Sequence, residues 1–101
     1  MTNLDISLKL IDLQGEFSRT GASVHNDWHE TLNEVEHRLH DSGRPPFPRR
    51  ESATNDDLIK TLTDIKKNIE HSMEMYQYAA VKYQEYLEAV ELAITRLKET
   101  N

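Results

Sequence analysis

Apolar residues recur every three or four positions through the second half of the chain, and no glycine or proline interrupts them. The series is Leu58, Leu62, Ile65, Ile69, Met73, Tyr76, Ala80, Tyr83, Leu87, Val90, Ile94 and Leu97. The mean step is about 3.5 residues, which is the repeat of the apolar seam in a left-handed coiled coil. The spacing therefore predicts one uninterrupted helix over residues 55–99.

Both ends of this helix carry suitable capping and charged residues. Thr54 followed by Asp57 three residues later has the pattern of a capping box. Acidic side chains in the first turn and Arg96 and Lys98 in the last turn match the two ends of the helix dipole. These signals support a start near residue 55 and an end near residue 99.

A similar apolar stripe follows the first half of the chain. Its members are Ile6, Leu10, Leu13, Phe17, Val24, Trp28, Leu32, Val35 and Leu39. The stripe stays in phase across Gly15 and Gly21, which favours a single helix over residues 3–41, although each glycine costs ~1 kcal/mol relative to alanine. The alternative is a break near Arg19–Ser23, with Asn26 or Asp27 capping a new helix.

The segment between the two stripes reads SGRPPFPRR, residues 42–50. Gly43 suits the position just after a helix, and the prolines at 45, 46 and 48 prevent the helix from continuing. The expected fold is therefore all-α: a single domain over residues 1–101, with a helix at about 3–41, a turn at 42–54 and a helix at about 55–99. At 1.5 Å per residue, the two helices of this antiparallel hairpin would be about 57 and 67 Å long.

Composition excludes several classes of function. A net charge of −6 argues against a nucleic-acid binder, which needs a basic surface. The absence of cysteine excludes disulfides and thiolate metal sites. No apolar run approaches the ~20 residues of a membrane span, so we expect no membrane insertion. The first residues do not form a cleavable signal peptide, so we expect a cytoplasmic protein, or export with a partner by a signal-peptide-independent route.

The sequence offers little that suggests catalysis. It has no glycine-rich phosphate-binding loop, and a two-helix hairpin has no pocket for a catalytic triad, so we expect no enzymatic activity and no cofactor. Histidines cluster with acidic residues in HNDWHETLNEVEHRLH, and His25 and His29, four apart, could share a metal ion. The apolar stripe runs through Trp28 and Leu32, so most of these histidines face away from it. A solvated helix face without a metal site is therefore favoured.

A second apolar stripe lies off the main seam in the late part of the chain, and its counterpart lies at the start of the first helix. Its members are Met75, Tyr78, Ala79, Tyr86, Ala89 and Ala93 on the second helix, and Leu4, Leu8 and Ile11 on the first. A two-helix hairpin has only one internal seam, so this stripe would be exposed, as at a partner-binding surface. The expected partner is a helical pair that completes a four-helix bundle, or a second copy of the chain in a homodimer.

The turn itself has two interpretations. Phe47 could be an apolar anchor of a second contact site, with Arg44, Arg49 and Arg50 steering an acidic surface toward it. Alternatively, the arginines offset neighbouring acidic residues and Phe47 packs back on the helices, so that the segment is a structural turn.

The opening LDISLKLIDLQGEF and the late stretch YAAVKYQEYLEAVELAI occur in an acidic, cysteine-free chain of 101 residues. This chain resembles the WXG family of small type VII secretion proteins, and more narrowly the small helical partners encoded beside LXG-domain toxins in Gram-positive bacteria. The resemblance implies a chaperone or targeting factor that binds the helical N-terminal domain of a toxin and presents it to the secretion machine. A free-standing cytoplasmic adaptor, immunity or anti-defence protein and a homodimeric structural coiled coil are alternatives with the same fold.

Overall fold

The computed structural model describes residues 1–20, 26–40 and 50–99. These residues form four α-helices and no strand: α1 (Asn3–Thr20), α2 (Asn26–Leu39), α3 (Asn55–Met75) and α4 (Ala80–Glu99). A short 3₁₀ turn, η1 (Gln77–Ala79), joins α3 to α4. The prediction of an all-α fold is confirmed for this part of the chain.

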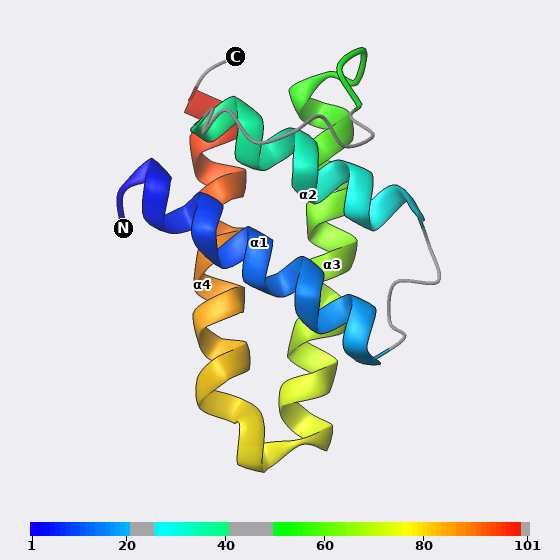
Figure 1. The fold of residues 1–101 in the computed structure, drawn as a ribbon, viewed down its shortest axis with the longest axis vertical. Helices are drawn as coiled ribbons and strands as arrows, with labels where there is room; N and C mark the ends of the chain where they lie inside the picture. Colours follow the sequence, from blue (N-terminus) through cyan, green and yellow to red (C-terminus); the bar gives the residue numbers. More distant parts are fainter. Residues whose placement is uncertain (21–25, 41–49, 100–101) are drawn as a thin grey trace.

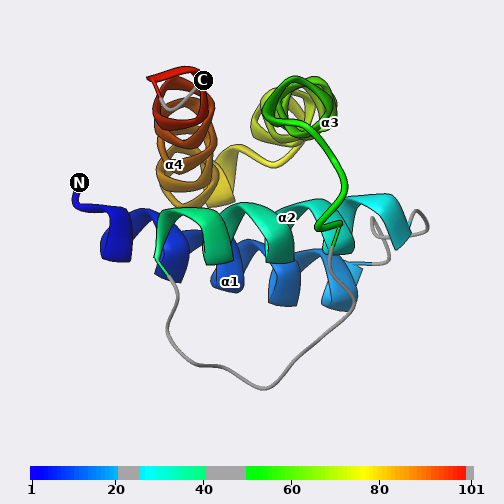
Figure 2. The same cartoon turned by 90° about the horizontal axis from the view of Figure 1, so that it is seen from above.

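The four helices form two layers (Figures 1 and 2). Helices α1 and α2 lie side by side in one layer, and α3 and α4 form the other. The first layer runs across the second, so that α1 packs on α4 and α2 packs on α3. The molecule is therefore two helical hairpins stacked on each other.

The predicted uninterrupted helix over residues 55–99 is wrong. Such a helix would be about 67 Å long, whereas the longest dimension of the molecule is 36 Å. Helix α3 ends at Met75, and Tyr76 has φ −123° and ψ 71°, outside the helical region. A straight helix would expose its second apolar stripe, whereas folding back at Tyr76 buries Tyr86, Ala89 and Ala93 inside the chain. Burial of apolar surface thus outweighs the loss of a few helical hydrogen bonds.

The single helix predicted over residues 3–41 is also wrong, and the alternative break is correct. Helix α1 ends at Thr20 and α2 begins at Asn26, while residues 21–25 lie outside the described residues. The two helices are antiparallel, because Ser7 Oγ donates to the Glu36 carbonyl (3.2 Å) and the Phe17 and Trp28 rings lie 5.4 Å apart. The layer formed by α1 and α2 covers faces of α4 that would be exposed in the predicted two-helix hairpin.

Most members of the two stripes identified in the sequence nevertheless lie in the core or pack against it, whereas Tyr76 is exposed and Val24 lies outside the described residues. The buried apolar side chains are Ile6, Leu10, Leu13, Phe17, Leu32, Val35, Leu58, Leu62, Ile65, Ile69, Tyr83, Tyr86, Ala89, Val90, Ala93 and Leu97. They come from all four helices, so the stripes meet in one contiguous centre. The helical starts and ends near residues 55 and 99 are also as predicted.

Side-chain hydrogen bonds connect α2, α3 and α4 at the end of the molecule where α3 begins. Arg38 Nε donates to Glu34 Oε2 (2.7 Å), and the same guanidinium donates to Asn55 Oδ1 (2.8 Å) and the Ala53 carbonyl (2.7 Å). Asn55 Nδ2 in turn donates to the Leu97 carbonyl (3.1 Å). Arg38 on α2 thereby connects the α1–α2 layer to the start of α3 and the residues before it. Asn55 extends this hydrogen-bond network to α4.

The predicted capping box at Thr54 is present. Thr54 Oγ1 accepts from the Asp57 amide, and Asp57 Oδ2 accepts from the Thr54 amide, both at 3.1 Å. Because these hydrogen bonds favour the ionised carboxylate, the pKa of Asp57 lies below its usual value. Thr2 and Asp5 make the equivalent pair at the start of α1.

Candidate functional site

The corner between α3 and α4 exposes large apolar side chains, which are not required to form a turn between two helices. Met75 is 61% exposed, Tyr76 44%, Tyr78 90% and Val81 79%. The Tyr76 and Tyr78 rings lie edge to face, 6.1 Å apart. We call Met75, Tyr76, Tyr78 and Val81 the corner patch.

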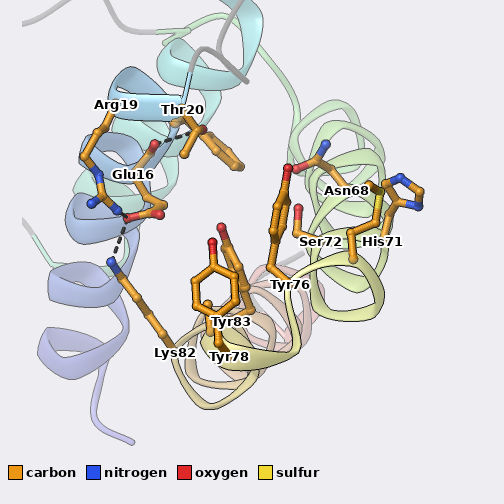
Figure 3. Close-up of a pocket in the computed structure, with 13 residues that line it drawn as sticks. Glu16, Arg19, Thr20, Asn68, His71, Ser72, Tyr76, Tyr78, Lys82 and Tyr83 are labelled. Carbon is orange, nitrogen blue, oxygen red and sulfur yellow. Dashed lines mark hydrogen bonds and ion pairs between the residues drawn. The ribbon is translucent and has the colours of Figure 1, made fainter.

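The corner patch adjoins a cleft of about 680 Å³ (Figure 3). The end of α1 forms one wall, the last turns of α3 form the opposite wall, and η1 and the start of α4 form the floor. Phe17 and Tyr83 contribute nearly buried rings, while Met75, Tyr76 and Tyr78 belong to both cleft and patch. The two features therefore form one continuous surface.

The α1 wall of the cleft carries an ion cluster. Glu16 Oε2 accepts from Lys82 Nζ on α4 at 2.7 Å and also from the Arg19 guanidinium one turn along α1. Burial acts to raise the pKa of Glu16, but the hydrogen bonds from Lys82 and Arg19 outweigh it, so this pKa lies below its usual value. The bond to Glu16 raises the pKa of Lys82. All three groups are therefore charged at neutral pH.

The tyrosines of the cleft differ in their environment. Burial raises the pKa of Tyr83, and the nearby Glu16 carboxylate raises it further. Tyr83 also packs against Tyr86, with ring centroids 6.3 Å apart, whereas Tyr78 extends into solvent. The cleft thus combines a fixed aromatic floor with a freely accessible aromatic rim.

The structure divides the predicted second apolar stripe into three groups. Met75 and Tyr78 are exposed at the corner, and Ala79 is half-buried beside them. Leu4 and Leu8 are exposed on α1, with Ile11 half-buried. The prediction of an exposed surface is wrong for the remaining members, Tyr86, Ala89 and Ala93, because the α1–α2 layer packs over α4 and helps to bury them.

The exposed members of the stripe do not form a single surface. Arg96, near the end of α4, donates to the Met1 carbonyl (2.9 Å), which places the start of α1 beside the end of α4, as expected. The corner patch lies at the other end of α4 (Figure 1). Leu4 is therefore separated from Met75 and Tyr78 by most of a 20-residue helix, whereas Leu8 lies nearer to them, because the next residue, Lys9, pairs with Glu85 in the second turn of α4 (2.8 Å).

Sequence reasoning missed the polar half of the cleft and half of the corner patch. Tyr76 was assigned to the internal seam, and Val81 was not singled out. The run Met73–Val81, with aromatic and apolar residues on every side, is a sequence signal for an exposed patch. Nothing in the pattern links Glu16 to Lys82, because their contact depends on how α1 crosses α4.

The predicted tip contact lies mostly outside the described residues, which include only Arg50 of its four members. Arg50 donates to Thr31 Oγ1 (2.8 Å) and Thr61 Oγ1 (3.4 Å). It thereby joins α2 to α3 through two hydroxyl groups, and the two interpretations of the tip, a contact site or a structural turn, stay predictions.

The described residues contain neither a metal-binding cluster nor a membrane-spanning helix. No group of three or more histidine, cysteine, aspartate or glutamate side chains there could hold a metal ion. His37 Nδ1 lies 2.7 Å from the Asn33 carbonyl, one turn earlier on α2, and His25 lies outside the described residues. No helix in the same part of the chain is long and apolar enough to span a bilayer.

Comparisons of the chain with protein-family models, curated proteins and solved structures give no match.

Proposed function

We propose that this chain is a non-catalytic protein-binding module that docks a helical partner on the corner patch and the adjoining cleft. The observation that carries the proposal is the exposure of Met75, Tyr76, Tyr78 and Val81 at one turn. Turns between helices are ordinarily polar, and clustered exposed apolar residues on a soluble domain mark interaction sites.

The composition of the surface supports this role. Tyrosine and methionine are enriched at protein–protein interfaces, and tyrosine is common among the residues that dominate binding energy. The buried floor beside the patch, Phe17 and Tyr83, belongs to the core and would hold the surface in place before a partner binds. A helix laid across the corner could bury its apolar face on both features.

We propose that the partner is the helical N-terminal domain of an LXG-type toxin and that the complex is exported through a type VII secretion system. This proposal is supported by the sequence resemblance to WXG-like proteins alone. The four-helix fold departs from the long two-helix hairpin that this resemblance implied.

A specific observation favours the second candidate, a free-standing adaptor, immunity or anti-defence protein. Three members of the apolar stripe that was expected to need a partner, Tyr86, Ala89 and Ala93, are buried within the described part of the chain. A domain that buries these side chains itself and exposes the compact corner patch suits a protein that binds and blocks a target.

Binding of purified chain to the N-terminal domain of an LXG toxin encoded beside it tests the proposal. We expect the double variant Tyr78→Asp/Val81→Asp to lose at least tenfold in affinity while keeping its helical circular dichroism. The matched control is Leu4→Asp/Leu8→Asp, which places the same two charges on exposed apolar sites of α1 outside the corner patch.

Loss of binding in Leu4→Asp/Leu8→Asp with retention in the corner variant would instead place docking at the start of α1. A wild-type chain that does not bind the toxin domain would exclude the secretion role. If that chain forms a dimer in sedimentation that the corner variant abolishes, the partner is a second copy.

A further inference from the structure

We infer that the cleft beside the corner patch recognises an acidic amphipathic helix, by taking one apolar side chain onto the Phe17–Tyr83 floor and an adjacent carboxylate onto Arg19 and Lys82. This inference rests on the proposed function and specifies the chemistry of the partner.

The size and lining of the cleft suit one large apolar side chain together with part of the helix that carries it. Its volume of about 680 Å³ falls in the range of ligand-binding clefts, ~300–1,000 Å³. Phe17 and Tyr83 are nearly buried at its floor, and Ala79 leaves room beside them. An aromatic or leucine side chain inserted there would be sheltered from water by the rings of Tyr76 and Tyr78.

The charges of the cleft favour an acidic partner. Two cations, Arg19 and Lys82, line it against one carboxylate, Glu16, although the whole chain carries a net charge of −6. Both cations donate to the same oxygen, Oε2 of Glu16. The cleft is therefore a locally positive site on an acidic molecule.

Arg19 and Lys82 have donors to offer a second carboxylate. Their side chains are 65% and 47% exposed, so each already faces solvent at the edge of the cleft. A guanidinium has five N–H donors and an ammonium three, so one bond to Glu16 leaves most of them available. A partner carboxylate could bind Arg19 in the bidentate geometry that is typical of this pair.

The opposite wall supplies hydrogen-bonding groups that an amphipathic helix can use. Figure 3 shows Asn68 and Ser72 on α3 facing Glu16 and Arg19 across the cleft, with Tyr76 and Tyr83 between them. A partner with a cationic group at the same place would meet Arg19 and Lys82, and like charges at an interface are unfavourable. An acidic helix is therefore the occupant that fits both walls.

The test uses two small probes with the same apolar body and opposite charge, 2-naphthylacetate and 2-(aminomethyl)naphthalene. Each is titrated into the wild-type chain, and binding is followed by amide chemical shifts in heteronuclear NMR. We expect the carboxylate to bind at least fivefold tighter than the amine, with the largest shifts at residues 16–20, 72–79 and 82–83.

Equal or tighter binding of the amine, no binding of either probe, or shifts centred elsewhere would overturn the inference. A second measurement uses Arg19→Gln, which we expect to reduce carboxylate binding at least threefold and to leave amine binding unchanged or stronger. The control Lys66→Gln removes a lysine of α3 that pairs with Glu91 outside the cleft. The inference is also wrong if the control reduces carboxylate binding as much as Arg19→Gln.

The outcome is separable from that of the proposed function. If the probes fail but Tyr78→Asp/Val81→Asp still abolishes partner binding, the patch docks a partner without the carboxylate recognition described here. If the probes behave as expected but the corner variant keeps its partner, the cleft recognises acidic groups and the proposed docking surface is wrong.

Discussion

The two ends of the α3–α4 hairpin are built in opposite ways. At the end where α3 begins, Arg38 and Asn55 connect three helices and the preceding chain through hydrogen bonds. At the other end, Tyr76 precedes η1 without forming a side-chain capping hydrogen bond, and large apolar side chains face solvent. One end is closed by polar contacts made within the chain, whereas the other presents apolar surface that the chain itself does not cover.

This difference separates stability from binding. Substitutions at the polar end should cost free energy of unfolding, because they break contacts that exist in the isolated chain. Substitutions at the corner should cost little stability and change binding. The following predictions test this separation, from the largest expected effect to the smallest.

Arg38→Ala should lower the free energy of unfolding by about 3–5 kcal/mol, because it removes the Arg38 cation from the buried Glu34 carboxylate and breaks the hydrogen bonds to Asn55 and the Ala53 carbonyl. Urea denaturation followed by circular dichroism measures the loss. Arg96→Ala is the matched control, since Arg96 bonds only exposed groups near the N-terminus among its described contacts, and should cost at most about 1 kcal/mol. Equal losses in the two variants would show that the Arg38 contacts have no special role.

Glu16→Gln should lower the free energy of unfolding by about 1–2 kcal/mol at neutral pH, since charge-assisted hydrogen bonds from Lys82 and Arg19 are lost. A carboxylate whose pKa is lowered by folding stabilises above its unfolded pKa and loses that contribution as pH falls through its folded pKa. The difference between wild type and variant should therefore shrink as pH falls below the ordinary value of 4.5. Denaturation at pH 7 and pH 3 checks this, and a constant difference would contradict it.

Thr54→Ala should cost about 1 kcal/mol through loss of the capping box at the start of α3. Thr54→Ser, which keeps the hydroxyl, is the control and should stay close to wild type. Thermal denaturation of the three chains resolves the difference, and an equal loss in the serine variant would assign the effect to the methyl group.

Tyr78→Ser should change the free energy of unfolding by less than about 0.5 kcal/mol, because its side chain is almost fully exposed. Tyr83→Ser, on the same corner but buried in the cleft floor, should cost several times more. A large loss in Tyr78→Ser would mean that the corner patch is part of the stable core, which would contradict its role as a docking surface.

Much of the fold followed from local pattern. The stripes from Ile6 to Leu39 and from Leu58 to Leu97 correctly identified most of the buried side chains, with Tyr76 as an exposed exception, because helical periodicity separates the side chains that avoid water from those that face it. The cap at Thr54 was equally local, since its two partners are three residues apart. The second stripe correctly marked Met75 and Tyr78 as exposed, but the same pattern wrongly marked Tyr86, Ala89 and Ala93 as exposed.

The helix that each stripe packs against was determined by the tertiary structure alone. A heptad pattern is the same whether the chain continues straight or turns back at Tyr76, so periodicity could not separate one long helix from two short ones. Tyr86, Ala89 and Ala93 are buried because α1 and α2 pack across α4, and Glu16 meets Lys82 for the same reason. Contacts between residues this far apart depend on the total apolar area that the whole chain can bury, and no local stretch of sequence contains that information.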